Sequence, residues 1–274
     1  MRTLIRECIH DSGDYREIDC FPVRKPNSSR KAKAKPSTNA QKILNQKNAA
    51  RRLTWLIQDN FGTNDYFLTL TYPLSFEGNE KMLNGKLFEN WFRRIRRIYK
   101  KQGVELKYIS STELGEDNKR LHHHLIISGG IEDNATVLKN EWNRNFNPCK
   151  KGYAHIEHMK FTRMGAAALA HYQTKNPRLF YRSYTCSKNL RHRPPTNRDG
   201  RISGKKLKEL RADNFNRAEF EKLYPGYEFV DADPHLELYD IDINGEATPI
   251  DFPYLTVRMF KKDSKYILRD EERT

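Results

Sequence analysis

Apolar and polar positions along the middle of the chain predict four strands. β-Branched and aromatic residues predict a strand over YFLTLTY (66–72), which ends before Pro73. ELKYISSTE (105–113) and RLHHHLIIS (120–128) predict a hairpin, because the polar turn LGEDNK separates them. YAHIEHMK (153–160) predicts a fourth strand.

Apolar residues at helical spacing predict helices between and around these strands. We expect helices over 38–60, 80–102, 134–145 and 161–176, the second ended by a glycine at 103 and the last by a proline at 177. From residue 66 onward the order is β-α-β-β-α-β-α. Its first six elements match the split β-α-β layout, an antiparallel α+β sheet with helices on one face.

The remaining segments carry weaker patterns. Residues 14–23 predict a short strand, 178–211 a basic loop-rich stretch, and 226–260 further strands. We therefore expect three parts: an N-terminal extension with a helix (1–60), a central domain (61–177), and a basic linker with a small β-containing C-terminal region (178–274).

Composition narrows the class of protein. The 274 residues include 50 Lys and Arg against 35 Asp and Glu, a formal net charge of +15. A charge of this sign makes a polyanion, most commonly nucleic acid, the expected partner. No apolar run is long enough for a membrane span, and the N-terminal residues do not resemble a secretory signal. The 4 cysteines form no metal-binding or disulfide pattern, so we expect reduced thiols and a cytoplasmic location.

The positive charge is concentrated in blocks. Residues 24–52 and 175–208 are strongly basic, whereas 227–251 carry acidic residues and no Lys or Arg. Such basic blocks suit phosphate contacts, although solvated faces or loose tails have the same composition. The candidate DNA-binding residues are Arg93, Arg94, Arg96, Arg97, Lys188 and Arg191.

Two histidines of the second hairpin strand are candidate metal ligands. Period-two alternation places His122 and His124 on one face of the sheet and His123 on the other. If Glu113 pairs across the hairpin with His122, its carboxylate completes a 2-His-1-carboxylate set with open coordination positions. A shifted register with His123 as ligand stays open, and His155 with Glu157 is a weaker rival pair.

A tyrosine and a lysine on the last predicted helix supply further chemistry. Tyr172 and Lys175 are three residues apart and therefore share a helix face. A tyrosine can act as a covalent nucleophile, and a nearby cation can stabilise the negative charge that develops.

Together these motifs resemble the HUH endonuclease superfamily, the rolling-circle replication initiators and their relaxase and transposase relatives. The resemblance covers about residues 61–177. FLTLTY (67–72) resembles the first family motif, LHHHLII (121–127) the metal-binding motif and YQTK (172–175) the Tyr-x-x-Lys motif. In closer detail the chain is similar to initiators of small phages, plasmids and integrated bacterial elements. His123 departs from the pattern, because the family usually has an apolar or aromatic residue there.

The resemblance implies a metal-dependent enzyme that cuts and rejoins single-stranded DNA. Mg²⁺ or Mn²⁺ held by Glu113, His122 and His124 would bind the scissile phosphate. Tyr172 would form a 5′-phosphotyrosine and release a 3′-OH primer, assisted by Lys175. No second tyrosine follows within the same turn, which indicates a one-tyrosine enzyme.

The expected partners are single-stranded DNA or a hairpin at a replication origin, with a host helicase and polymerase in a bacterial cell. A phosphate-binding helicase motif is absent from the sequence. The alternatives are a nucleic-acid-binding protein with this fold and no catalysis, a related transposase or relaxase, or a metallohydrolase that uses water. The sequence does not indicate an oligomeric state.

Overall fold

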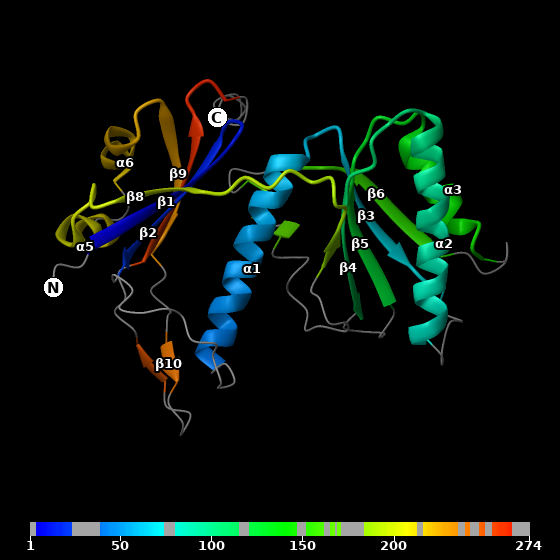
Figure 1. Ribbon diagram of the computed structural model, residues 1–274, viewed down its shortest axis with the longest axis horizontal. Helices are drawn as coiled ribbons and strands as arrows, with labels where there is room; N and C mark the ends of the chain where they lie inside the picture. The colour runs from blue at the N-terminus through cyan, green and yellow to red at the C-terminus, as the bar shows by residue number, and fades with distance from the viewer. Residues whose placement is uncertain are drawn as a thin grey trace, which may run out of the picture. The chain divides into compact units, whose positions relative to one another are not determined.

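The structure, a computed structural model, describes most of the chain as two compact units (Figure 1). One unit comprises Met1–Asp59, Thr162–Ala167 and His192–Thr274, and the other comprises Asn60–Phe161 and Ala168–Arg191. The described residues are 4–23, 39–73, 80–114, 121–146, 152–161, 165–167, 169–170, 184–212, 216–234, 239–241, 247–249 and 254–264.

The central unit confirms the predicted split β-α-β architecture. Its elements are β3 (Tyr66–Thr71), α2 (Glu80–Lys101), β4 (Tyr108–Leu114), β5 (Leu121–Ile127), α3 (Asn134–Asn143), β6 (Tyr153–His158) and β7 (Thr185–Cys186). The strands form one antiparallel sheet in the order β6-β3-β5-β4-β7. Helices α2 and α3 lie on the same face of this sheet (Figure 1).

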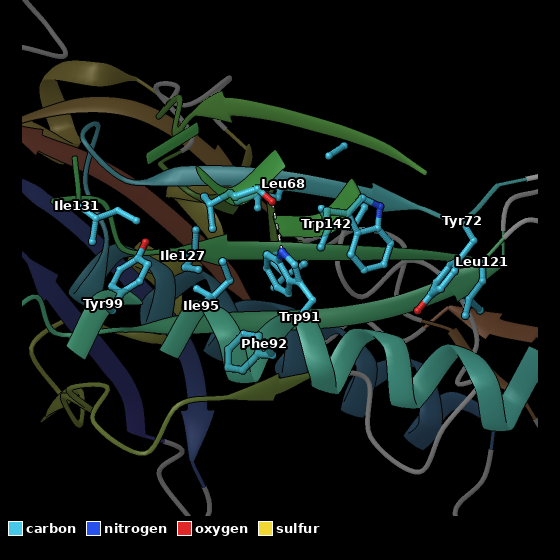
Figure 2. Close-up of a cluster of buried hydrophobic side chains, with 14 residues drawn as sticks. Leu68, Tyr72, Trp91, Phe92, Ile95, Tyr99, Leu121, Ile127, Ile131 and Trp142 are labelled. Carbon is cyan, nitrogen blue, oxygen red and sulfur yellow. Dashed lines mark hydrogen bonds between the residues drawn. The ribbon is translucent and has the colours of Figure 1, made fainter. Parts of the chain in front are cut away.

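Alternation along the strands separates a covered face from the face with the candidate ligands. Leu68 and Leu70 of β3 are fully buried against Trp91 and Ile95 of α2. Figure 2 shows these α2 side chains gathered with Trp142 against the strands. The Trp91 indole donates a hydrogen bond to the Leu138 carbonyl at 3.3 Å. This core fixes the sheet on which the candidate site is built.

Glycines end α2 and β5 for different steric reasons. Gly103 has φ +69°, the left-handed conformation that terminates many helices, and its N–H donates to the Lys100 carbonyl. A Cβ at Gly129, just beyond β5, would lie 2.2 Å from the Asn64 carbonyl oxygen. Both ends therefore agree with the sequence-based expectation.

The second unit joins segments from both ends of the chain. It contains β1 (Leu4–Ser12), β2 (Tyr15–Val23), α1 (Asn39–Asn60, whose last residue belongs to the central unit), β8 (Thr196–Asp199), α5 (Gly204–Ala212), α6 (Arg217–Leu223), β9 (Tyr227–Asp233), the hairpin of β10 (Tyr239–Ile241) and β11 (Ala247–Pro249), and β12 (Leu255–Lys261). The main sheet has the order β8-β1-β2-β12-β9, with antiparallel neighbours. The structure therefore groups the predicted N-terminal extension and C-terminal region together.

Three differences from the sequence-based prediction occur in this unit. Strand β1 and helices α5 and α6 were not expected, and the predicted 161–176 helix lies largely outside the described residues. Cys8, Cys20 and Cys186 are free thiols, whereas Cys149 lies outside the described residues. Among the described helices, none combines the length and apolar character that crossing a membrane requires.

Candidate functional site

The register of three adjacent strands brings the predicted metal ligands onto one sheet face. Glu113 of β4 pairs directly with His122 of β5, which in turn pairs with Thr71 of β3. One pair further along, His124 lies between Thr69 and Ser111. Facing residues of neighbouring strands project to the same side. The predicted hairpin register is therefore confirmed.

Two threonine hydroxyls hold the candidate imidazoles. Thr71 Oγ1 lies 2.8 Å from His122 Nδ1, and Thr69 Oγ1 lies 3.1 Å from His124 Nδ1. A hydrogen bond at one ring nitrogen fixes the orientation of the ring and the tautomer. The two rings are nearly parallel, with 28° between their planes and 6.2 Å between their centroids. The sequence-based analysis did not identify these threonine partners, although the alternation in FLTLTY places both hydroxyls on the histidine face.

Glu113 contacts the more deeply buried histidine. His124 Nε2 lies 2.7 Å from Glu113 Oε1, and His124 is only 1% exposed. Burial lowers the pKa of His124, and the hydrogen bond and charge of Glu113 oppose part of that effect. The neutral imidazole that burial favours is also the form that binds a metal ion.

The donor chemistry of this cluster fits a divalent cation. Two imidazoles with hydrogen-bonded Nδ1 atoms and one carboxylate share a face, as in 2-His-1-carboxylate sites. In the part of the chain that the structure describes, no group of three or more His, Cys, Asp and Glu side chains is close enough together to hold a metal ion. The metal assignment therefore rests on ligand type, register and the threonine partners.

His123 belongs to the opposite face and to the hydrophobic core. Its Nε2 lies 2.9 Å from the Tyr72 hydroxyl, and its Nδ1 lies 2.8 Å from Thr112 Oγ1. Its ring stacks on Phe88 at 4.1 Å between centroids. Burial, together with the two neighbouring imidazoles, lowers the pKa of His123 to about 3. The alternative register with His123 as a ligand is therefore not the one found.

The rival pair on β6 shares the same face but has another partner. His155 pairs with Thr69, on the side of β3 opposite to His124. Glu157 forms an ion pair with Lys160 at 2.9 Å. This carboxylate is thus engaged near the end of its own strand and does not turn toward the histidine pair.

The predicted catalytic pair and the predicted DNA contacts have different outcomes. Tyr172 and Lys175 lie outside the described residues. Arg93, Arg96, Arg97, Lys188 and Arg191 are exposed, as DNA contacts require. Arg94 is different, because its guanidinium donates to the Glu141 carboxylate at 2.6 Å, to the Glu141 carbonyl and to Asn145. Arg94 therefore joins α2 to the end of α3.

Comparison with known proteins identifies the central segment. Residues 65–177 match the family model for the replication-associated protein ORF2. Searches of curated proteins and of solved structures found no significant match. The matched segment begins just before β3, contains β5 with its three histidines and ends at Pro177, so it carries all three motifs of the predicted resemblance. Over residues 65–177, the chain therefore belongs to this family of replication-associated proteins, as expected of a rolling-circle replication initiator.

Proposed function

We propose that the protein initiates rolling-circle replication by nicking and rejoining single-stranded DNA. The observation that supports this most strongly is the placement of Glu113, His122 and His124 on one sheet face, within a segment of the replication-associated family. A replication initiator binds DNA, and the net charge of +15 suits a nucleic-acid partner. Its origin DNA, with a host helicase and polymerase, places the protein in the cytoplasm of a bacterial cell.

In this proposal, the residues on the sheet hold the cofactor. Glu113, His122 and His124 would hold Mg²⁺ or Mn²⁺, which when bound polarises a phosphate oxygen as a Lewis acid. Thr69 and Thr71 keep both imidazoles oriented through their Nδ1 atoms. Glu113 contributes negative charge, which attracts the cation to the sheet face.

Tyr172 is the proposed nucleophile. Its phenolic oxygen forms the bond to phosphorus while the bond from phosphorus to the 3′-oxygen breaks. The tyrosine loses its proton and the departing 3′-oxygen gains one, which yields a 5′-phosphotyrosine and a 3′-OH primer. Lys175 would stabilise the phenolate or the phosphate charge. Reversal of the same step rejoins the strand without ATP, because the phosphotyrosine retains the energy of the broken bond.

The test is covalent trapping on single-stranded DNA. Wild-type protein is incubated with labelled origin-derived oligonucleotides and Mn²⁺, denatured, and separated by size. We expect a protein–DNA adduct that Tyr172→Phe abolishes while binding to DNA is retained. The His122→Ala, His124→Ala pair should also lose the adduct. Tyr184→Phe is the matched control, because Tyr184 lies beyond the predicted helix and should retain adduct formation.

Other outcomes separate the competing functions. Binding without any adduct, across many origin sequences, would favour a nucleic-acid-binding protein that has this fold and no catalysis. Cleavage retained in Tyr172→Phe would favour a hydrolase that uses water. Nicking by the double histidine variant in Mn²⁺ would overturn the metal assignment.

A further inference from the structure

A cavity on the helix-covered face of the central sheet is separate from the histidine site. It lies between α2 and the edge formed by β4 and β7, with a volume of about 390 Å³. Its walls include the rings of Phe88, Phe92 and Tyr108. This volume is within the range of small-molecule sites, roughly 300–1,000 Å³. The cavity is therefore large enough for a nucleobase and part of its sugar-phosphate.

The aromatic wall offers flat apolar surface. Phe92 and Tyr108 meet edge to face, with 4.4 Å between centroids and 67° between planes. Phe88 lies beside Phe92 at 5.8 Å. Phe92 is buried, whereas Phe88 and Tyr108 are half-buried and so keep part of their rings accessible. Stacking on such rings is how proteins hold bases of single strands without reading their sequence.

Two arginines give the mouth of the cavity a positive charge. Arg93 and Arg96 line it, and both are exposed. The Arg96 guanidinium lies 4.7 Å from the centroid of the Phe92 ring and donates a hydrogen bond to the Tyr108 hydroxyl at 3.3 Å. Arg96 is therefore held beside the aromatic wall, where it can meet a phosphate attached to a stacked base.

Hydrogen-bonding groups complete the lining. The exposed carboxylate of Glu89 can accept a hydrogen bond from an exocyclic amino group. Ser110 and Thr185 also line the cavity, and their hydroxyls lie 2.8 Å apart. Rings, guanidinium groups and a carboxylate together suit a nucleotide better than a purely apolar ligand.

The cavity and the histidine site share strand β4. Ser110 lines the cavity, and Glu113 is three residues further on and faces the histidines. Three residues of a strand span about 10 Å. Because odd and even residues of β4 face opposite sides, a single strand reaching both places would pass around the sheet edge at β7.

From this geometry we propose that the α2–β4–β7 cavity holds one nucleotide of the single-stranded DNA, a few nucleotides from the phosphate that is cut. The base stacks among Phe88, Phe92 and Tyr108, and Arg93 and Arg96 contact its flanking phosphates. The inference rests on the proposed function for the identity of the strand, but the cavity does not take part in the chemistry.

The test combines mapping with affinity measurements on the full-length chain. All proteins carry Tyr172→Phe and are studied in EDTA, so that cleavage does not interfere. A single-stranded oligonucleotide with 5-iododeoxyuridine is photocrosslinked, and the attached peptide is identified by mass spectrometry. We expect crosslinks at Phe88 or Tyr108. Crosslinks found only on peptides outside the cavity would overturn the proposal.

Substitutions at Tyr108 test the stacking. Tyr108→Ser should weaken binding of a fluorescent single strand about 5-fold or more, whereas Tyr108→Phe, which retains the ring, should bind like the parent. Circular dichroism checks that both variants fold. Equal affinity of the serine and phenylalanine variants would contradict the stacking role.

Arginine pairs of equal charge test the phosphate contacts. Arg93→Gln with Arg96→Gln should lower the dependence of log affinity on log salt concentration by about 1.4, as expected for two single-strand phosphate contacts. The control is Arg97→Gln with Lys101→Gln, exposed residues of α2 outside the cavity lining. Equal changes in both pairs would show diffuse charge and overturn the cavity assignment.

The proposed function and the cavity assignment can fail separately. Adduct formation by the protein with native Tyr172, together with unchanged binding by all cavity variants, would leave the initiator proposal intact and overturn the cavity. Loss of binding in the cavity variants without any adduct from the parent would do the reverse. Absence of single-strand binding by the parent would overturn both.

Discussion

The threonines of β3 are the residues that most directly support the candidate metal site. Thr69 and Thr71 are each hydrogen-bonded to one imidazole of the histidine pair. Thr112 makes the same kind of contact with His123, but on the core face of the sheet. The three hydroxyls therefore have similar bonds and different expected roles.

Thr69→Val and Thr71→Val should each weaken Mn²⁺ binding about 10- to 100-fold, because a ligand imidazole loses the partner that orients it. Isothermal titration calorimetry measures the affinity directly. Thr112→Val is the matched control and should change Mn²⁺ affinity less than about 2-fold. A similar loss in all three variants would show that the hydroxyls act only through the stability of the sheet.

His123 is a core residue of the metal-binding motif. His123→Phe should leave Mn²⁺ affinity unchanged and lower the free energy of unfolding by about 1–3 kcal/mol, because Tyr72 and Thr112 lose a buried hydrogen-bond partner. Chemical denaturation and calorimetry separate the two effects. His124→Phe serves as the comparison and should abolish Mn²⁺ binding. Loss of Mn²⁺ binding in His123→Phe would contradict the assignment of faces.

At the scale of single elements, helix α2 divides its arginines between structure and surface. Arg94 is ion-paired with Glu141 and bonded to Asn145, and its side chain is 23% exposed. Arg97 is exposed and lies on the same helix. The sequence-based list of DNA contacts placed both in one class, because a run of arginines does not reveal which of them has an acidic partner from another element.

Arg94→Ala should therefore lower the free energy of unfolding by about 1.5–3 kcal/mol, the range for hydrogen bonds to charged groups. Arg97→Ala should change it by less than about 0.5 kcal/mol and should instead weaken DNA binding. Urea denaturation and fluorescence anisotropy measure the two quantities. A stability loss in Arg97→Ala as large as that in Arg94→Ala would contradict this division.

The central sheet was predictable because its burial follows simple periods. YFLTLT alternates across the two faces, and Trp91 and Ile95 recur at helical spacing, so β3 and α2 were found nearly to the residue. The 113–122 pairing followed from a short polar turn. Strand β1 was missed because the fully buried Glu7 and the nearly buried His10 interrupt its apolar pattern. The threonine contacts were missed because the bonding partner of a hydroxyl depends on the neighbouring strand.

At the scale of the whole molecule, buried charges join distant segments of the chain. Glu7 of β1 is fully buried and accepts hydrogen bonds from Arg201 at 2.7 and 2.8 Å and from Tyr224 at 2.6 Å. Burial raises the pKa of Glu7, but the bonds from Arg201 and Tyr224 outweigh it and hold the pKa below the ordinary value. The N-terminal strand is therefore held in the unit by residues about 200 positions away.

Arg201→Gln should destabilise this unit by about 3 kcal/mol, because it leaves a buried carboxylate without its charged partner. Hydrogen exchange followed by mass spectrometry should show faster exchange in β1, β2 and β12, with β3 and β5 unchanged. Lys205→Gln, at an exposed position of α5, is the control. Faster exchange in both sheets would contradict the independence of the two units.

The position of β12 has a consequence for the order in which the protein forms during synthesis. β12 pairs with β2 and β9, and its Thr256 is bonded to Asp19, 237 residues earlier. The β1–β2 hairpin therefore leaves the ribosome with one edge unpaired and waits for almost the whole chain, whereas the strands of the histidine site come from a much shorter stretch of the sequence. Closing so long a loop is slow. The nascent chain would thus complete its candidate metal-binding sheet before it completes the sheet that contains its own N-terminal strands, and a chaperone that binds the exposed hairpin edge would act in that interval.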